Sequence, residues 1–342
     1  MKGVLIVNLG SPDAPTPESV KPYLEEFLMD KYVIDMPYWL RSLIVKGIIL
    51  RTRPKKSAKA YKKIWWEEGS PLIVISKNKH KLVQEKVSIP VALAMRYGKP
   101  SIANGLEELH KKGVTEVLLM PMYPQYAMAT TLTIEELAEK IVAEKYPNMK
   151  LTKFPAFYNK KEYIDSLVTV ISESAKDKAF DHLLFSYHGV PERHIKKTDK
   201  TKKHNGIKIV EDTYCCQPNS PEAETCYRTH CFETTRLVTE QMNLPKEKFS
   251  QSFQSRLGID KWLEPFTVDA VERLAKEGVK KLAVVTPAFV ADCIETLEEI
   301  EMEAGKLFKE HGGESFHLIP CLNTHPQWID ALVQWITEWE NK

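Results

Sequence analysis

The amino-acid sequence predicts an α/β protein of two similar Rossmann-like domains, each built on a parallel sheet with helices on both faces. Short apolar runs rich in β-branched residues alternate along the chain with segments of helical period. The 342 residues exceed the usual size of a single hydrophobic core, and two domains of about 150 residues each are the common outcome. A weak internal repeat, offset by about half the chain, favours the same architecture.

The alternation can be followed from one end of the chain to the other. Apolar runs of strand length lie at 3–8, 91–96, 116–121, 182–187, 282–286 and 316–322. Helical periods lie at 17–29, 101–112, 133–146, 293–311 and 327–340. The strand expected at 182–187 is followed by a longer segment before the next expected strand at 282–286. Strand and helix in turn are typical of a sheet whose parallel strands are joined by helical crossovers.

The internal repeat joins two helix-glycine-strand units. Residues 106–114 end in Lys-Lys-Gly-Val before an apolar run and Pro121, and residues 271–279 end in Lys-Glu-Gly-Val before another run and Pro287. Chance is the competing explanation, because units of this kind share composition for purely physical reasons. The repeat predicts two domains of similar topology.

Composition and charge limit the partners that need to be considered. With 43% apolar residues, 27% charged residues and a net charge of +2, the chain resembles an ordinary globular protein, and nothing in it requires nucleic acid. The apolar N-terminal run ends at Gly10 without a cleavage pattern, and no apolar stretch reaches the roughly 18 to 20 residues that span a bilayer. We expect a cytoplasmic protein whose six cysteines are thiols or metal ligands rather than disulfides.

Polar side chains cluster just after the expected strands, at 10–12, 96–97, 123–126, 186–189 and 292–295. Ligands of open α/β sheets bind beyond the carboxyl ends of the strands, so we expect a site in a cleft between the two domains. No Gly-x-Gly-x-x-Gly or Walker-type loop follows any strand, which argues against a nucleotide ligand.

His188 is the first candidate for chemistry. It follows the run 183–187 and precedes Gly189, where a strand leaves the sheet and its last side chain can project into a cleft. A histidine there can accept a proton or bind a metal near neutral pH. Taken alone, such a residue is more often a structural hydrogen-bonding group.

Three glutamates form the second candidate. Glu295, Glu299 and Glu303 recur every four residues on the helix expected from Asp292, so they lie on one stripe with about 40° of drift per step. A solvated helix face is the ordinary explanation of such a stripe. The position of Glu295 in the first turn after a buried strand favours a start that faces the cleft.

Several segments in their order resemble ferrochelatases. They are Ser-Tyr-His-Gly-Val-Pro at 186–191, Tyr-Pro-Gln-Tyr at 123–126, Gln-Ser-Arg at 254–256 with Trp-Leu-Glu-Pro at 262–265, and Pro-Ala-Phe-Val-Ala-Asp-Cys-Ile-Glu-Thr-Leu at 287–297. The match runs from Leu9-Gly10 to the C-terminal helix and so covers nearly the whole chain. The His-Gly and Ile-Glu-Thr-Leu segments are specific as a pair.

The resemblance implies a chelatase fold with an N-terminal domain at 1–157, a C-terminal domain at 158–324 and a helix at 325–342 that returns to the first domain. It implies insertion of Fe²⁺ into protoporphyrin IX or coproporphyrin III late in haem biosynthesis. His188 and Glu295 become the pair for iron and proton transfer, and Glu299 and Glu303 extend the acidic path. The implied porphyrin contacts are Tyr123, Trp262 and, for a propionate, Arg96.

The segment 37–51 is apolar and aromatic, with basic residues towards its ends. In ferrochelatases the corresponding region forms a lip over the porphyrin site, so we expect a packed lid. The alternative is peripheral membrane contact, with apolar groups buried in the interface and Lys or Arg at anionic lipid.

Four cysteines, Cys215, Cys216, Cys226 and Cys231, lie within 17 residues. Clustering in a cytoplasmic chain favours a metal, but the spacing lacks the paired Cys-x-x-Cys knuckles of most structural zinc sites. Some ferrochelatases carry a [2Fe–2S] cluster, so the resemblance favours such a cluster here. Zinc and free thiols remain alternatives, and His230 could replace one of the two adjacent cysteines as a ligand.

Two other functions fit the same architecture. A cobalt-inserting chelatase would keep the roles of His188 and Glu295 while changing the tetrapyrrole. A two-domain carrier of haem or another small molecule is the alternative without catalysis, and the acidic stripe counts against it.

Overall fold

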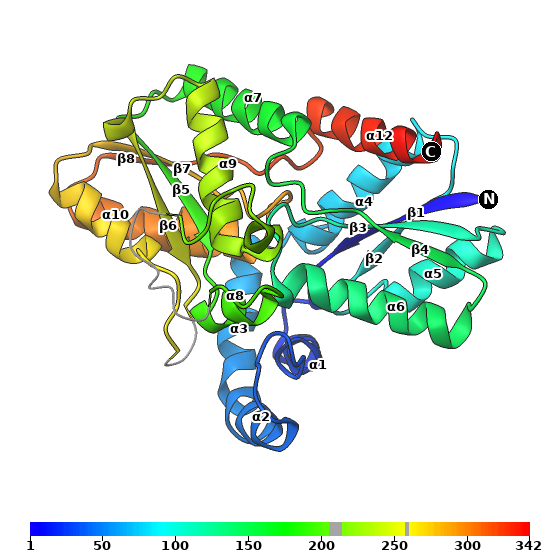
Figure 1. Cartoon of the computed structure of the whole chain (residues 1–342). Helices are drawn as coiled ribbons and strands as arrows, with labels where there is room; N and C mark the ends of the chain where they lie inside the picture. Colours follow the sequence, from blue (N-terminus) through cyan, green and yellow to red (C-terminus); the bar gives the residue numbers. More distant parts are fainter. Residues whose placement is uncertain (205–213, 257–259) are drawn as a thin grey trace. The chain divides into compact units, whose positions relative to one another are not determined.

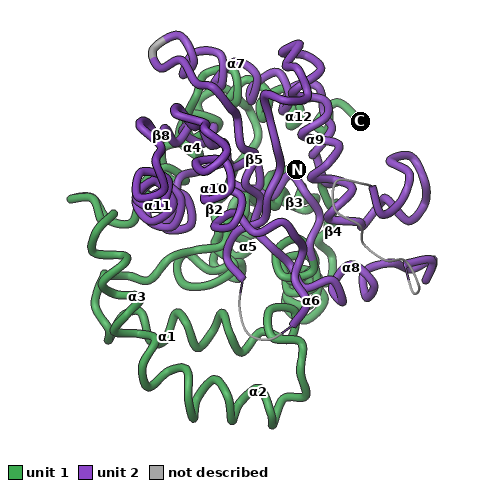
Figure 2. Tube along the Cα trace, turned by 90° about the vertical axis from the view of Figure 1, so that its left-hand side faces the viewer, with its two compact units in different colours: residues 1–122, 128–155, 323–342 green, residues 123–127, 156–322 purple. Residues whose placement is uncertain are grey.

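The computed structural model describes residues 1–204, 214–256 and 260–342 (Figure 1). The chain divides into two compact units, which Figure 2 distinguishes by colour. Unit 1 comprises 1–122, 128–155 and 323–342, and unit 2 comprises 123–127 and 156–322. The short segment 123–127, which we expected in the first domain, therefore belongs to the second unit.

Unit 1 contains a four-stranded parallel sheet in the order β2-β1-β3-β4. Its strands are β1 (Lys2–Asn8), β2 (Val91–Met95), β3 (Glu116–Pro121) and β4 (Lys150–Lys153). Its helices are α1 (Pro17–Leu28), α2 (Tyr38–Ile44), the π-helix η1 (Val45–Ile49), α3 (Leu50–Ile64), α4 (Pro71–Gln84), α5 (Ile102–Lys111), the π-helix η2 (Met128–Leu132), α6 (Thr133–Lys145) and α12 (Pro326–Glu340).

Unit 2 contains a second four-stranded parallel sheet, in the order β6-β5-β7-β8. Its strands are β5 (His182–His188), β6 (Phe249–Gln254), β7 (Lys281–Val285) and β8 (Ser315–Leu318). Its helices are α7 (Lys161–Asp177), α8 (Glu192–Thr198), η3 (Pro221–Thr225), α9 (Tyr227–Gln241), η4 (Lys246–Lys248), α10 (Thr267–Lys276), the π-helix η5 (Glu295–Ala304) and α11 (Gly305–Glu310).

The two sheets have the same topology. In each, the first strand in sequence lies between the second and the third, and the fourth pairs with the third. The two repeat units occupy equivalent places, because α5 leads into β3 and α10 leads into β7. Each helix is followed by a glycine of positive φ, Gly113 at 80° and Gly278 at 95°, in the left-handed region where other residues are strained. The expectation of two similar α/β units is confirmed.

Two strands lay outside the sequence expectation, and both are polar. β4 is a short edge strand with the sequence Lys-Leu-Thr-Lys, which gives no apolar run. β6 buries Gln251, Ser252 and Gln254 instead of an apolar row. Gln251 Oε1 accepts from Thr235, Ser252 bonds Thr267 and Gln254 Oε1 accepts from Ser186, and these bonds make the burial of the strand tolerable. Nε2 of Gln251 has no hydrogen-bond partner among the residues that the structure describes.

The C-terminal helix α12 is part of unit 1. Trp328, Trp335 and Ile336 are buried, and the ring of Trp335 packs on Phe154 with centroids 5.2 Å apart. Lys86, which follows α4, pairs with Asp330 at 2.5 Å. The helix is therefore held by an apolar face and by an ion pair at its edge.

The structure changes the helix type expected for 293–311. Its first part is the π-helix η5 and only the second part, α11, is α-helical. A π-helix has i→i+5 hydrogen bonds and therefore more than four residues per turn, so side chains four apart fall slightly short of a full turn. Such segments are frequent at functional sites.

The segment 37–51 folds as α2, η1 and the start of α3. Within the described parts of the chain, no helix combines the length and the apolar character needed to cross a membrane.

Candidate active site and cysteine group

His188 is the last residue of β5 and lies opposite Gln254, the last residue of β6. Its Nδ1 is 2.7 Å from the carbonyl oxygen of Gly189. A carbonyl can only accept, so Nδ1 carries the proton and Nε2 of the neutral ring has its lone pair available. The phenyl ring of Phe289 meets the imidazole edge-on, with centroids 6.2 Å apart.

Gln254 and Ser255 connect this strand end to η5. The side-chain amide of Gln254 donates to the carbonyl oxygen of Glu295 at 2.9 Å and lies 3.5 Å from Oε2 of Glu299. Ser255 Oγ donates to the same Glu299 oxygen at 2.5 Å. The motif Gln-Ser-Arg carried the resemblance in the sequence, but these three contacts could not be predicted from it.

The start of η5 is fixed by a local polar turn. Thr296 Oγ1 donates to Asp292 Oδ1 at 3.1 Å and accepts from the backbone N–H of Cys293 at 3.0 Å. Further along, Ile300 and Ala304 pack in the core of unit 2 with Phe308 of α11. Because these contacts bury one side of η5 in the core, Glu295, Glu299 and Glu303 lie on its other side.

The three glutamates differ in their surroundings. Glu295 and Glu299 are half-buried, whereas Glu303 is exposed. Burial raises the pKa of Glu299, the hydrogen bond from Ser255 and the electrostatic interaction with a protonated His188 act against this rise, and the charge of Glu295 adds to it. His188, Glu295 and Glu299 are therefore close enough to interact electrostatically, while Glu303 lies at the solvent end of the stripe.

Trp262 packs beside the strand end that carries His188. It forms a bridge with Pro191, and a Cβ on Gly189 would approach its ring to 3.2 Å. The indole is buried, and Nε1 has no hydrogen-bond partner among the residues that the structure describes. Tyr123 is also buried and belongs to the same unit.

Arg96 lies in unit 1 at the end of β2, and its guanidinium is already engaged. Nη2 pairs with Asp30, and Nε donates to Thr133 Oγ1 at 2.8 Å. Tyr97 also donates to this Asp30 oxygen at 2.9 Å. This arrangement holds the arginine in a local network, so a propionate would meet a guanidinium whose charge is already balanced.

The cysteine segment forms a compact group. His204, Cys215, Cys216 and Cys226 each present a ligand atom, and these four atoms lie within 4.8 Å of one another. The sulfurs of Cys215 and Cys226 are 3.0 Å apart. Hydrogen bonds from Cys216 and then from Cys226 lower the pKa of Cys215, so one thiolate is stabilised in the group.

His204 is a member that the sequence interpretation missed. Its Nδ1 donates to Asp199 Oδ2 at 2.9 Å, and Thr201 also bonds Asp199. The ring is buried, and Nε2 has no partner of ordinary hydrogen-bond geometry within the described residues. Interaction with the sulfur of Cys215, and then of Cys216, raises the pKa of His204 to about 10. The Asp-x-x-x-x-His spacing before the cysteines was the available signal.

Cys231 and His230 lie outside this compact group. Cys231 is fully buried in α9, and burial raises its pKa, with a smaller contribution from the charge of Cys215. His230 uses both ring nitrogens, because Nδ1 accepts from the N–H of Tyr126 at 3.1 Å and Nε2 donates to the carbonyl of Ala223 at 2.7 Å. Burial lowers the pKa of His230 to about 3, so the substitution of His230 for a cysteine is not supported.

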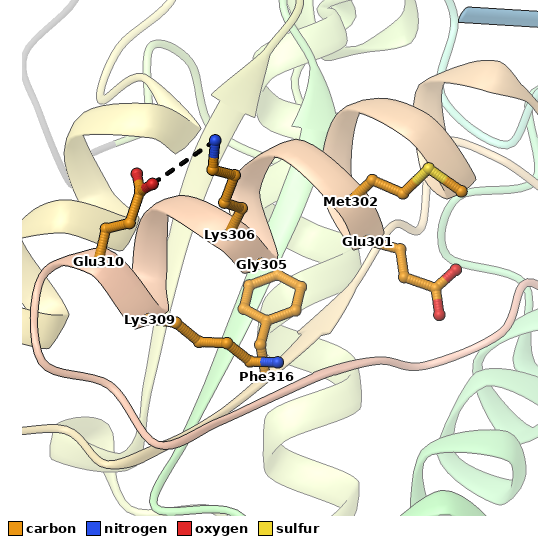
Figure 3. A pocket seen from close by; sticks show the side chains of 7 residues that line it. All are labelled: Glu301, Met302, Gly305, Lys306, Lys309, Glu310 and Phe316. Atoms are coloured by element: carbon orange, nitrogen blue, oxygen red, sulfur yellow. Dashed lines mark ion pairs between the residues drawn. The ribbon is translucent and has the colours of Figure 1, made fainter. Parts of the chain in front are cut away.

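A separate pocket lies along η5 and α11, beside β8. It has a volume of about 620 Å³ and is lined by Glu301, Met302, Gly305, Lys306, Lys309, Glu310 and Phe316 (Figure 3). Lys306 and Glu310 pair at 3.6 Å, so the charges that line it are partly balanced. None of the residues predicted to act on porphyrin or iron lines this pocket.

Comparison with known proteins identifies the family. A family model described as ferrochelatase matches residues 1–339. Ferrochelatases of Pseudomonas fluorescens (strain SBW25) and Ectopseudomonas mendocina (strain ymp) are each 47% identical to this chain, and each alignment covers 96% of this chain and 95% of the relative.

Among solved structures, the sirohydrochlorin chelatase SirB of Bacillus subtilis subspecies spizizenii in complex with cobalt superposes with a TM-score of 0.55 at 11% identity, over 98% of this chain and 94% of that one. SirB from Bacillus subtilis with Fe³⁺ gives 0.54 at 13% identity, with the same coverage. At this identity the likeness supports the chelatase fold alone. From the family match over nearly its whole length, the chain belongs to the ferrochelatase family.

Proposed function

We propose that this ferrochelatase inserts Fe²⁺ into a porphyrin with His188 as proton acceptor and with Glu295 and Glu299 as the groups that receive the iron. Ferrochelatase activity joins Fe²⁺ to the macrocycle in haem biosynthesis and releases two pyrrole protons. The observation that carries the assignment is the convergence of His188, Glu295 and Glu299 at the ends of β5 and β6.

Proton removal needs a base that is neutral before it acts. The bond from His188 Nδ1 to the carbonyl of Gly189 favours the tautomer with an unprotonated Nε2. An imidazole of this kind can take a pyrrole proton near neutral pH. Glu299, whose pKa is raised by burial, is the neighbouring group that can hold a proton in turn.

Iron delivery needs ligands that bind the hydrated dication and then release it. Carboxylate oxygens suit this role better than thiolates, which would retain a soft or borderline metal. Glu303 at the exposed end of the stripe is the proposed entrance, and Glu299 and Glu295 follow towards His188. Distortion of the flat macrocycle would expose its nitrogen lone pairs, and binding of the rest of the porphyrin can supply that strain.

Tyr123 and Trp262 are the proposed porphyrin contacts in unit 2. The buried indole N–H of Trp262 supports this role, because no described residue accepts its hydrogen bond. Arg96 remains the proposed propionate contact, although its bonds to Asp30 and Thr133 favour a role in holding unit 1 together.

One assay tests the proposal and separates it from its rivals. Purified protein is incubated without oxygen with Fe²⁺ and either protoporphyrin IX or coproporphyrin III, and metalloporphyrin is followed by absorbance. Insertion of iron into one of them is expected. Preference for Co²⁺ in direct competition would favour the cobalt chelatase, and binding without insertion of any metal would favour the carrier.

We also propose that Cys215, Cys216, Cys226 and Cys231 hold a [2Fe–2S] cluster. The compact group of thiols, the stabilised thiolate of Cys215 and the burial of Cys231 close to that thiolate support the proposal. His204 then faces the sulfurs as a hydrogen-bond donor oriented by Asp199. When bound, such a cluster would cross-link the segment before α9 to the helix, which is a structural role.

Segment 37–51 is proposed to contact a membrane surface as well as to cover the substrate. Tyr38, Trp39, Leu43 and Ile48 are between 61% and 69% exposed, which is unusual for large apolar side chains so close in sequence. Arg51 and Arg53 are exposed just beyond them. Co-sedimentation with anionic phosphatidylglycerol vesicles should decrease in Trp39→Ser and Leu43→Ser, and an equal affinity of wild type and both variants would exclude this contact.

A further inference from the structure

We propose that Tyr227 is a positioning residue for iron insertion, because its hydroxyl fixes the peptide group that follows His188. The inference rests on the proposed role of His188. Tyr227 acts through that backbone and is not assigned a contact with porphyrin or iron.

The peptide group between His188 and Gly189 is held at both ends. Its carbonyl accepts from Tyr227 Oη at 2.7 Å, and its N–H donates to the carbonyl of Gln254 at 2.7 Å. A side chain at Gly189 would place its Cβ 2.8 Å from that Gln254 oxygen, so the close approach requires glycine. Of these two bonds, only the one from Tyr227 comes from a side chain and can be removed by substitution.

The imidazole depends on the same stretch of backbone. His188 Nδ1 donates to the carbonyl oxygen of Gly189, which belongs to the next peptide group. Rotation of the His188–Gly189 peptide would therefore move the acceptor that sets the tautomer of the ring. Since catalytic groups tolerate little displacement, loss of the Tyr227 bond should reduce turnover more than it reduces porphyrin binding.

Tyr227 is itself firmly placed. It is the first residue of α9, and its side chain is buried. One turn further, His230 of the same helix accepts from the N–H of Tyr126 and stacks on Tyr158 with ring centroids 3.7 Å apart. The N-terminal end of α9 thus holds two segments that carry proposed site residues, the end of β5 and 123–127.

The test compares two tyrosines from the same region. Tyr227→Phe removes the hydroxyl that donates to the carbonyl of His188 and that also interacts with the thiol of Cys231. Tyr214→Phe removes a hydroxyl that donates to Glu233 at 3.0 Å and that, within the described parts of the chain, makes no hydrogen bond to β5. Tyr214 is adjacent to Cys215 and Tyr227 is adjacent to Cys226. Each variant therefore removes one tyrosine hydroxyl next to a cysteine of the compact group, which makes Tyr214→Phe a matched control.

The readouts are kcat and KM for whichever of protoporphyrin IX and coproporphyrin III the wild type metallates faster, with Fe²⁺ under anaerobic conditions. Porphyrin binding is titrated by fluorescence quenching, and kcat is expressed per bound porphyrin. A merely structural role would lower the number of binding sites without changing turnover per site. Iron, sulfide and zinc contents are measured so that an effect through the cysteine group is detected.

We expect turnover per site of Tyr227→Phe to fall about fivefold, the loss that corresponds to one net hydrogen bond of about 1 kcal/mol, with KM and metal content unchanged. Tyr214→Phe should match the wild type. Normal turnover per site in Tyr227→Phe, or an equal loss in Tyr214→Phe, would overturn the inference. If His188→Ala keeps its turnover, the proposed function itself fails; an inactive His188→Ala beside a normal Tyr227→Phe rejects the positioning role alone.

Discussion

Ser255 Oγ donates a hydrogen bond of 2.5 Å to Oε2 of Glu299, and Ser255 adopts a positive φ of 67° to do so. A non-glycine residue in this region is strained, and such strain is found where the surrounding structure requires a particular side-chain position. The Ser255 hydroxyl therefore supplies a hydrogen-bond donor to the half-buried carboxyl group of Glu299.

This relationship predicts different effects of two substitutions at Ser255. Both Ser255→Ala and Ser255→Gly lose the donor, so kcat/KM for iron should fall about tenfold in each, as expected for a hydrogen bond to a charged group. Glycine relieves the positive φ and alanine does not, so the glycine variant should have the higher Tm. Wild-type activity in the glycine variant would mean that Ser255 matters for backbone conformation only.

The raised pKa of Glu299 predicts that replacing this residue with neutral glutamine stabilises the protein, and that the gain depends on pH. Because burial raises its pKa in the folded state, the stabilising contribution of Glu299 is complete below the ordinary pKa of 4.5 and is lost as pH rises through the folded-state value. Glu299→Gln should therefore raise Tm at pH 8 and give little change at pH 4. Thermal unfolding of metal-free protein at both pH values measures this, and a gain confined to pH 4 would contradict the sign.

His188→Ala should abolish iron insertion while porphyrin binding and folding remain. His182, at the other end of β5, provides a matched control, because it bonds Ser250 and has no proposed role. His182→Ala should keep near-normal turnover. Turnover of His188→Ala within a factor of ten of the wild type would show that another group accepts the pyrrole protons.

Glu295→Gln keeps the volume of the side chain and removes its charge, so it should lower kcat strongly, by about a hundredfold or more. Glu303→Gln makes the same change at the exposed end of η5 and should raise KM for iron only a few-fold. Kinetics across a range of Fe²⁺ concentrations separate the two effects. Equal losses in both variants would argue against a graded path along the helix.

Local patterns predicted most of the fold, because apolar strands such as β1, β3 and β7 are visible without tertiary information. β6 was missed because its buried side chains are Gln and Ser, and only partners distant in sequence make their burial tolerable. The π-helical form of η5 was missed for a related reason. A spacing of four residues suits an α-helix and a π-helix almost equally, so the sequence does not distinguish them.

The main residues of the candidate site were predicted from the sequence, but the contacts that support them were not. His188 and Glu295 follow strands and carry specific motifs, whereas the supporting contacts of Ser255 and Tyr227 join residues 44 and 39 positions apart. Such long-range pairings depend on the path of the chain and leave no local pattern. The Asp199–His204 pair is local instead, and it was missed because the prediction of metal ligands rested on the spacing of the cysteines.

The fourth ligand of the proposed cluster is Cys231, which lies outside the compact group of His204, Cys215, Cys216 and Cys226. A [2Fe–2S] cluster bound by four cysteines needs one pair of ligands for each iron, so a fourth ligand outside the compact group is compatible with it. Protein purified without oxygen should then be red-brown. Cys231→Ser should lose the colour, the iron and the sulfide, although Cys231 lies outside the four atoms that are within 4.8 Å of one another.

His204→Ala should retain the cluster in this case, but with a lower reduction potential, because hydrogen bonds to cluster sulfurs raise that potential. The opposite pattern, with colour kept in Cys231→Ser and lost in His204→Ala, would make His204 the fourth ligand and Asp199 its orienting partner. A colourless wild type that contains one zinc per chain would instead identify a mononuclear site of three thiolates and one imidazole, for which the compact group has suitable ligands.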